Sequence, residues 1–161
     1  IMQNVQSILE ALFKEKIADY TEDSNAKDYF GCNFEIKNLA IKFRKAKITP
    51  KKVGCFVALW KRDSEGKTIP FDASDLFDFY CIEVEDGIMK GIFVFPKSIL
   101  IQNKILSSDK EGKRGFRLYP SWCVSLNSQA MKTQNWQLPY FVNLNQNEKD
   151  SLKQFDKIFK I

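Results

Sequence analysis

The first quarter of the chain shows a helical and then an alternating spacing of apolar residues. The helical spacing predicts an amphipathic helix over residues 4–18, carried by Val5, Leu9, Leu12, Phe13 and Ile17. The polar segment TEDSNAKD ends this pattern. Two short alternating runs follow at residues 32–36 and 39–43, separated only by Lys37 and Asn38. This arrangement predicts a β-hairpin.

Two more strand patterns occupy the middle of the chain. Residues 54–62 are apolar on both faces of a strand, which is typical of a position in the middle of a sheet. Residues 78–96 alternate more clearly and carry Asp86 and Gly87 where the chain reverses. They predict a second hairpin.

Helical patterns dominate the remainder. We expect a short helix, a brief strand and two longer helices at residues 97–102, 116–120, 125 or 128 to 138, and 147–161. Ser125 or Ser128 caps the third of these elements, and Pro139 ends it. The chain has no internal repeat and no low-complexity linker. The pattern predicts a single domain over residues 1–161 with mixed α+β or three-layer α/β architecture.

Charge is segregated along this pattern. Residues 36–62 contain nine basic and no acidic residues, whereas residues 63–94 contain eight acidic residues against Lys67 and Lys90. The basic residues are interleaved with large apolar ones, so they belong to a folded surface and not to a disordered tail. Such a surface attracts a polyanion such as nucleic acid. A solvated strand face without a partner is the alternative interpretation.

Composition excludes several kinds of chemistry. The net charge is +5 and the pI is about 9.0, so any polyanion binding depends on where the charge lies. The chain has no histidine, which removes imidazole-based triads and histidine-ligated zinc. It also lacks CxxC pairs and the glycine-rich phosphate loops GxGxxG and GxxxxGK[ST]. Any catalysis would have to use Asp, Glu, Lys or a carboxylate-bound Mg²⁺.

The cysteines and the apolar runs indicate a compartment. Four scattered cysteines, three of them in apolar strand patterns, are expected to be reduced core residues. No apolar run is long enough to span a bilayer, and the N-terminal segment does not have the pattern of a signal peptide. We expect a cytoplasmic protein without membrane contact.

Five motifs occur in a characteristic order: FRKAKITPKKVGCFVALWKR, PFDASDLFDFYCI, FVFPKSIL, GKRGFRLYPSW and QAMKTQNWQLPYF. In this order they resemble the MepB-like family of small bacterial proteins, over roughly residues 30–141. The resemblance implies a restriction-endonuclease-like fold of the PD-(D/E)xK type, in which a central mixed sheet is flanked by helices. It also implies an association with multidrug efflux and its regulation.

A PD-(D/E)xK nuclease needs an Asp on one strand and an acid-x-Lys on its neighbour, so that two carboxylates hold Mg²⁺ and the lysine assists the attacking water. The nearest counterpart is Asp78 with Phe95-Pro96-Lys97, where Phe95 replaces the second acid. Glu35-Ile36-Lys37 has the right spacing but only Asp28 upstream.

A third grouping joins Asp75, Asp78, Arg44 and Lys47, which makes Asp75 and Asp78 the candidate metal ligands. We expect a degenerate, noncatalytic relative that needs no cofactor. An active nuclease with Mg²⁺ is the alternative.

The basic residues are the candidate nucleic-acid contacts, mainly to phosphates. They are Arg44, Lys47, Lys51, Lys61, Arg62, Lys97, Lys113, Arg114 and Arg117. The alternative role of Arg44 is an ion pair with Asp78 across the sheet. Trp122 and Tyr119 are candidates for stacking on unpaired bases, whereas Phe56 and Trp60 are expected to belong to the core. An acidic partner protein, in a regulatory role, is the alternative to nucleic acid.

Overall fold

The computed structural model describes residues 2–159, and side chains from residue 5 onward. The helical elements are α1 (Met2–Phe13), η1 (Ser24–Tyr29), α2 (Lys97–Gln102), α3 (Ser128–Gln137), η2 (Leu138–Tyr140) and α4 (Glu148–Phe159). The strands are β1 (Ala18–Glu22), β2 (Cys32–Ile36), β3 (Leu39–Lys45), β4 (Lys47–Ile48), β5 (Cys55–Ala58), β6 (Trp60–Arg62), β7 (Thr68–Pro70), β8 (Phe79–Asp86), β9 (Met89–Pro96), β10 (Gly115–Leu118) and β11 (Phe141–Asn143).

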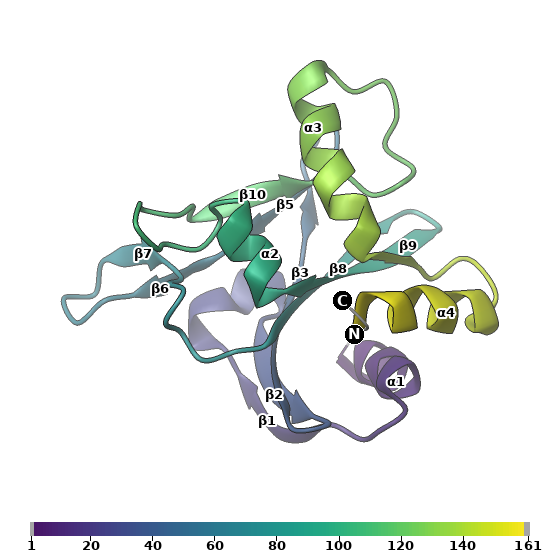
Figure 1. Cartoon of the computed structure of the whole chain (residues 1–161), viewed down its shortest axis with the longest axis horizontal. Coiled ribbons are helices and arrows are strands. Elements are labelled where there is room, and N and C mark those ends of the chain that lie inside the picture. Colours follow the sequence, from purple (N-terminus) through teal and green to yellow (C-terminus); the bar gives the residue numbers. More distant parts are fainter. Residues whose placement is uncertain (1, 160–161) are drawn as a thin grey trace.

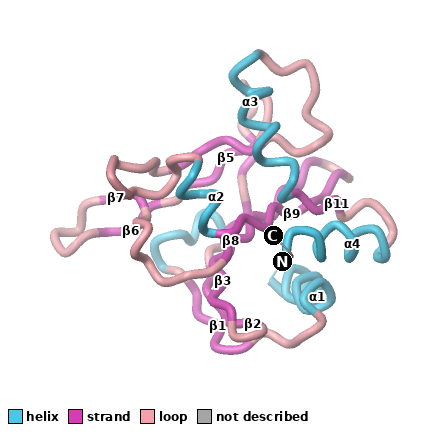
Figure 2. The backbone as a smooth tube through the Cα atoms, in the orientation of Figure 1, coloured by secondary structure: helices cyan, strands magenta, loops and turns pink. Residues whose placement is uncertain are grey.

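A six-stranded mixed sheet forms the centre of the molecule (Figures 1 and 2). Its order is β1-β2-β3-β8-β9-β11, and β3 and β8 are its parallel pair, whereas the other neighbours run antiparallel. The two parallel strands lie in the middle of the sheet, where both faces are covered. Buried residues therefore dominate β8 along most of its length, as expected for such a strand.

Helices α1 and α4 cover one face of this sheet, here called the α4 face. The Phe13 ring packs edge-on against Phe155 and Phe159, with centroids 4.8 and 5.0 Å apart. Phe159 also lies 4.5 Å from the ring of Phe79 on β8. These contacts join both termini to the central strands.

The opposite face, here called the α3 face, is covered by α2, α3 and two small sheets (Figure 1). The small sheets have the orders β10-β5-β4 and β6-β7. Phe95 on β9 lies 5.5 Å from the Trp136 ring on α3, and Tyr80 on β8 packs against Phe71 and Phe77. The predicted fold, a central mixed sheet flanked by helices, is confirmed.

Both predicted hairpins are present. Lys37 and Asn38 both adopt the left-handed conformation, with φ of 52° and 61°, and they form the two-residue turn between β2 and β3. In the second hairpin Asp86 pairs with Met89, so Gly87 and Ile88 form the turn, one position later than expected.

The N-terminal helix is shorter than predicted. It ends at Phe13, and Lys14 follows in the left-handed conformation. The Glu10 carboxylate then accepts a hydrogen bond from the Ile17 N–H at 2.8 Å, which turns the chain towards β1. Strand β1 was not predicted because all five of its residues are exposed at the sheet edge and give no apolar alternation.

The prediction of one continuous strand over residues 54–62 is wrong, whereas the expected position in the middle of a sheet is confirmed for β5. The segment divides at Leu59 into β5 and β6, which belong to different small sheets. Val57 and Leu59 are buried, whereas Phe56 and Trp60 are half-buried. The segment is apolar on both faces because β5 lies in the middle of a small sheet, and this small sheet covers the main sheet.

The later elements agree with the sequence pattern. Helix α3 starts at Ser128, but the expected cap at Ser125 or Ser128 is wrong, because the side chain of Asn127 is the one that accepts from the Ala130 N–H, at 2.8 Å. The terminal helix runs to Phe159, while residues 160–161 of the prediction lie outside the described residues. No helix in the described part of the chain is long and apolar enough to cross a bilayer. All four cysteines are free thiols.

Candidate functional site

In the expected nuclease motif, Asp78 and Lys97 meet through their backbones and not through their side chains. Asp78 directly precedes β8 and Lys97 directly follows β9, and the Lys97 N–H donates to the Asp78 carbonyl at 3.0 Å. The Asp78 carboxylate is already used, because it accepts from the Ala40 N–H of β3 at 2.8 Å. Phe95 is fully buried and stacks on Phe93, so its position belongs to the core.

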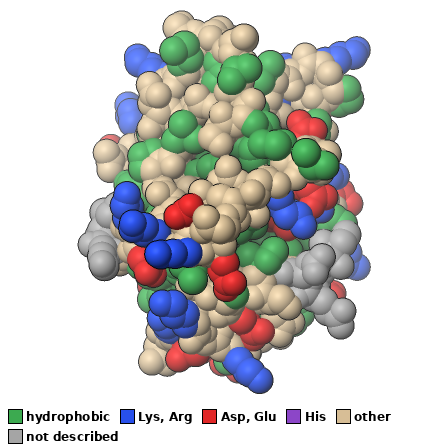
Figure 3. Space-filling model, turned by 90° about the vertical axis from the view of Figure 1, so that its right-hand side faces the viewer, with side chains coloured by type: hydrophobic (Ala, Val, Ile, Leu, Met, Phe, Trp, Pro, Cys, Tyr) green, Lys and Arg blue, Asp and Glu red, His purple; other side chains and the backbone are tan. Residues whose placement is uncertain are grey.

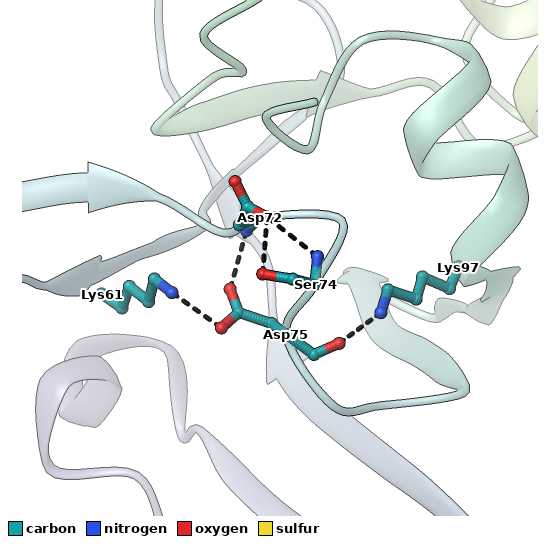
Figure 4. A network of polar contacts seen from close by, with 5 residues as sticks. All are labelled: Lys61, Asp72, Ser74, Asp75 and Lys97. Atoms are coloured by element: carbon teal, nitrogen blue, oxygen red, sulfur yellow. Dashed lines mark hydrogen bonds and ion pairs between the residues drawn. The ribbon is translucent and has the colours of Figure 1, made fainter. Parts of the chain in front are cut away.

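Asp75 is the centre of a polar network in the loop before β8 (Figure 4). One of its carboxylate oxygens forms an ion pair with Lys61 at 2.7 Å, and the other accepts from the Asp72 N–H at 2.7 Å. The Asp72 carboxylate in turn accepts from the Ser74 N–H and hydroxyl at 2.8 and 2.7 Å. These bonds to Ser74 lower the pKa of Asp72.

The lysines around Asp75 have internal roles. The Lys97 ammonium donates to the Asp75 backbone carbonyl (Figure 4). Its Nζ also lies 5.2 Å from the centre of the Phe77 ring. Lys42, which we did not single out from the sequence, donates to the Asn33 side chain at 3.0 Å and lies over Phe71. Burial lowers the pKa of Lys42.

The expected carboxylates do not converge on a metal site. Asp75 and Asp78 have separate partners, and Glu35 and Asp28 are exposed on β2 and η1. Within the described residues, no group of three or more Cys, Asp or Glu side chains is placed to hold a metal ion. The residues present therefore do not fit the two-carboxylate Mg²⁺ site of a PD-(D/E)xK nuclease.

Arg44 is not an exposed phosphate contact, and its partner is not Asp78. The side chain is 1% exposed, and its guanidinium forms an ion pair with Asp23 at 2.9 Å and lies 5.8 Å from the centre of the Tyr80 ring. Arg44 points to the α3 face of the sheet, where η1 covers it. A cation enclosed in this way contributes to the structure and is not accessible to a phosphate. Arg44 is therefore no longer a candidate nucleic-acid contact.

Three candidate lysines remain exposed without an ion pair among the described residues: Lys47, Lys51 and Lys113. Two candidate arginines are exposed but hold loops. Arg62 donates to the Gly66 carbonyl at 2.9 Å, and Arg114 donates to the Thr68 carbonyl at 3.0 Å and pairs with Glu111. Both guanidinium groups remain accessible to a ligand, but their hydrogen bonds to loop carbonyls restrict their orientation.

Arg117 on β10 holds the segment between β4 and β5. Its guanidinium donates to the Thr49 hydroxyl at 2.6 Å and to backbone carbonyls of residues 52–54. None of these partners is a carboxylate. The arginine therefore fixes the basic segment that carries Lys51 beside β10 while keeping its own charge unneutralised.

A groove of about 370 Å³ is lined by residues of β10 and α3 and by residues that directly follow α2. We call it the β10–α3 groove. Its lining contains two cations, four aromatic rings and several amide or hydroxyl groups, but no carboxylate. The lining residues are Phe56, Asn103, Ile105, Lys113, Gly115, Phe116, Arg117, Tyr119, Asn127, Gln129, Ala130, Thr133 and Trp136.

The aromatic candidates from the sequence divide between the groove and the core. Tyr119 lines the groove, whereas Trp122 does not and packs edge-on against Phe141 of β11 at 5.7 Å. Trp122 is thus half-buried against the main sheet and lies outside the groove lining. Phe56, which we assigned to the core, is half-buried and lines the groove.

Helix α3 is held beside β10 by two glutamines. The Gln137 amide donates to the Arg117 carbonyl at 2.8 Å and accepts from the Tyr119 N–H at 2.9 Å. Gln134 donates to three carbonyls of residues 119–123. The sequence showed the polar face of α3 but not the groove, because two of its walls, β10 and α3, come from two different motifs.

Comparison with known proteins identifies the family. The sequence model of the MepB-like family matches residues 23–143, so the chain belongs to the MepB-like family. A solved structure titled "Crystal Structure of MepB" is 36% identical in sequence and superposes with a TM-score of 0.81. The alignment covers 89% of this chain and 98% of that one.

A bacterial homing endonuclease, I-Ssp6803I, superposes with a TM-score of 0.46 at 14% identity, covering 81% of this chain and 82% of the endonuclease. This likeness is too slight to support an argument about the site. Comparison with curated protein sequences gives no match.

Proposed function

We propose that this MepB-like protein binds nucleic acid, mainly through phosphates, at the β10–α3 groove and the exposed lysines beside it. The observation that carries the proposal is the charge of the groove. Lys113 and Arg117 line it, and no Asp or Glu does. A concave surface with cations and no carboxylate concentrates positive potential where a polyanion can enter.

The basic segment before β5 extends this surface. Arg117 binds the carbonyls of residues 52–54, so the segment that carries Lys51 lies against the end of β10. Lys47 is exposed on β4, which belongs to the same small sheet as β10. Phosphates of a strand that enters the groove therefore have further cations within the same region.

Other surfaces carry mixed charge. The hollow beside the Asp75 network is lined by Asp72, Asp109 and Glu111 as well as by Lys61 and Lys110. On the face that carries α4, basic and acidic side chains are interspersed (Figure 3). Attraction of a polyanion is therefore weaker at these places than at the groove.

The proposal includes a noncatalytic role and a cytoplasmic location, where bacterial nucleic acid lies. In this proposal the protein keeps a restriction-endonuclease-like fold, but the carboxylates that were candidate metal ligands are used in contacts within the protein. Lys61 and Lys97 support this view, because both are tied to Asp75 and neither is free to assist a reaction. Lys47, Lys51, Lys113, Arg114 and Arg117 are the expected phosphate contacts.

The test is a fluorescence-anisotropy titration of labelled oligonucleotides at several salt concentrations. Affinity should fall steeply as salt rises, since phosphate neutralisation releases counterions. Lys113→Gln and Lys51→Gln should each weaken binding and reduce the salt slope by about one contact. Lys67→Gln is the matched control, because Lys67 is exposed in the loop between β6 and β7, outside the groove lining.

Binding that does not respond to salt would contradict the proposal. The same holds if Lys67→Gln weakens binding as much as Lys113→Gln does, because the groove would then have no special role.

A further inference from the structure

We propose that the β10–α3 groove receives an unpaired nucleotide of a single strand, with its base against the aromatic rings and its phosphate at Lys113 and Arg117. This inference rests on the proposed function and adds the form of nucleic acid that binds. It follows from the walls of the groove, which offer more than charge.

The groove has the size and the surfaces for a base. Its volume of about 370 Å³ lies within the range of small-molecule sites, roughly 300–1,000 Å³. Phe56, Tyr119 and Trp136 are only half-buried and line it from β5, the end of β10 and α3. Every base has a π-face that can stack on such rings, whatever its sequence.

The rings are held in place before any ligand binds. Trp136 packs against Phe95 and Phe116, with ring centres 5.5 and 6.4 Å away. The Phe56 ring lies over Gly115, where a Cβ atom would come within 2.6 Å of its Cζ atom. A larger residue at position 115 would displace that ring. A preformed aromatic surface lowers the entropy cost of stacking.

Polar groups in the groove remain without partners. Among the described residues, the Gln129 amide, the Tyr119 hydroxyl and the Trp136 indole N–H make no hydrogen bond, although all three residues line the groove. Asn127 differs, because its side chain caps α3. Free donors and acceptors beside exposed rings suit the edge of an unpaired base.

A duplex cannot use these features in the same way. Its bases are already stacked and paired, so a duplex presents phosphates to the rim of the groove and no free base face. Both forms of nucleic acid gain from Lys113 and Arg117, but only a single strand gains from the rings. The structure thus predicts a preference for single strands on top of the general attraction to phosphate.

The experiment compares four probes at one salt concentration: a single-stranded oligothymidylate, an abasic strand with the same number of phosphates, a duplex of equal length, and thymidine monophosphate. The oligothymidylate should bind roughly tenfold more tightly than the abasic strand and the duplex. Thymidine monophosphate should bind much more weakly than the strand, because it lacks the neighbouring phosphates.

Phe56→Leu tests the ring directly, since leucine keeps an apolar side chain but removes the stacking face. It should bring the affinity for the oligothymidylate close to that for the abasic strand and leave abasic and duplex binding unchanged. Phe30→Leu is the control, because Phe30 is 50% exposed but lies outside the groove. Thermal unfolding of both variants shows that each remains folded.

The outcomes separate the two proposals. Equal affinity for oligothymidylate, abasic strand and duplex overturns this inference and leaves phosphate binding standing. Monophosphate binding as tight as strand binding also overturns it, since the site would then serve a free nucleotide. Absence of binding to every probe at low salt overturns both the inference and the proposed function.

Discussion

Arg44 shows how a residue in a basic sequence run can serve the interior of the protein. Its guanidinium is enclosed between η1 and the sheet, paired with Asp23 and placed over the Tyr80 ring. Gly31 makes room for it, because a Cβ atom at that position would collide with the Arg44 guanidinium. Among the described residues, two guanidinium nitrogens of Arg44 have no hydrogen-bond acceptor, so the ion pair with Asp23 carries most of the compensation for burying the charge.

Replacing Arg44 with alanine should destabilise the protein by about 3–5 kcal/mol, because it leaves the Asp23 carboxylate unpaired and opens a cavity against Tyr80. Urea denaturation measures the effect. Lys45→Ala is the control on the same strand. Lys45 is partly exposed and lies 3.7 Å from Glu85 and 4.0 Å from Glu83, so its ion pairs are longer and less enclosed than the Arg44–Asp23 pair, and its loss should cost clearly less than the loss of Arg44. Similar losses of unfolding free energy in both variants would show that the Arg44–Asp23 ion pair has no special role in stability.

A second prediction at this scale concerns pH. Burial raises the pKa of Glu83 on β8, the neighbouring Glu85 raises it further, and Lys45 and Lys90 only partly oppose this. The folded protein therefore holds this proton more tightly than the unfolded chain does. The contribution of Glu83 to stability is fully present below the ordinary pKa of a glutamate. It is lost as the pH rises through the higher pKa of the folded state.

Glu83→Gln removes this titration. The melting temperature of the variant, measured relative to the original protein over a pH series, should increase across that window and then become constant. A difference that falls with rising pH would mean that the charges of Lys45 and Lys90 outweigh the cost of burial.

At the level of elements, the groove depends on how α3 docks beside β10. Gln137 is fully buried and satisfies one N–H and one carbonyl at the end of β10. The Gln134 amide donates to three carbonyls of the loop that follows. Side-chain amides thus replace the neighbouring strand that β10 lacks on this side, and they fix the distance between the two walls of the groove.

Gln137→Leu should destabilise the protein by about 2–4 kcal/mol, since it leaves two buried backbone groups without partners. Asn135→Leu, an exposed position on the same helix, should have little effect. Hydrogen exchange adds a local measurement: the Tyr119 N–H should exchange faster in the Gln137 variant. Unchanged protection there would show that α3 is held mainly by its apolar contacts.

At the level of the whole molecule, the carboxylates and the free cations are separated. Asp75, Asp78 and Asp23 each have a partner within the fold, whereas among the described residues the lining of the β10–α3 groove contains Lys113 and Arg117 and no carboxylate. This separation supports the proposal that an anion binds at the groove. Its acids are not arranged to hold a hard cation.

We accordingly expect no cleavage of plasmid DNA or single-stranded RNA with Mg²⁺ or Mn²⁺, because Asp75 is paired with Lys61 and Asp78 accepts from the Ala40 N–H, so the two carboxylates do not form a metal site. Gel electrophoresis of the products and the melting temperature with and without metal measure this. Cleavage that EDTA and Asp75→Asn both abolish would mean that Lys61 moves aside when substrate binds.

The sequence by itself determined the parts of this protein that depend on near neighbours. Both hairpins follow from alternation and from the residues at their turns, and α4 follows from its apolar spacing. The sequence placed α3 between a capping residue and Pro139, although the cap is Asn127 and not one of the expected serines. The family also followed from the order of motifs. These features need only local geometry, since a turn or a helix is set by residues a few positions apart.

Only the tertiary structure decided which charges are free. Asp23 and Arg44 lie 21 positions apart in the chain, and Arg117 reaches the Thr49 hydroxyl across 68 positions. An edge strand such as β1 and the groove between β10 and α3 likewise depend on packing between distant segments. A lysine or arginine has the same appearance in the sequence whether it ends in solvent, on a carbonyl or against a carboxylate. Its neighbours are set by how the layers pack, and that packing has no local signature.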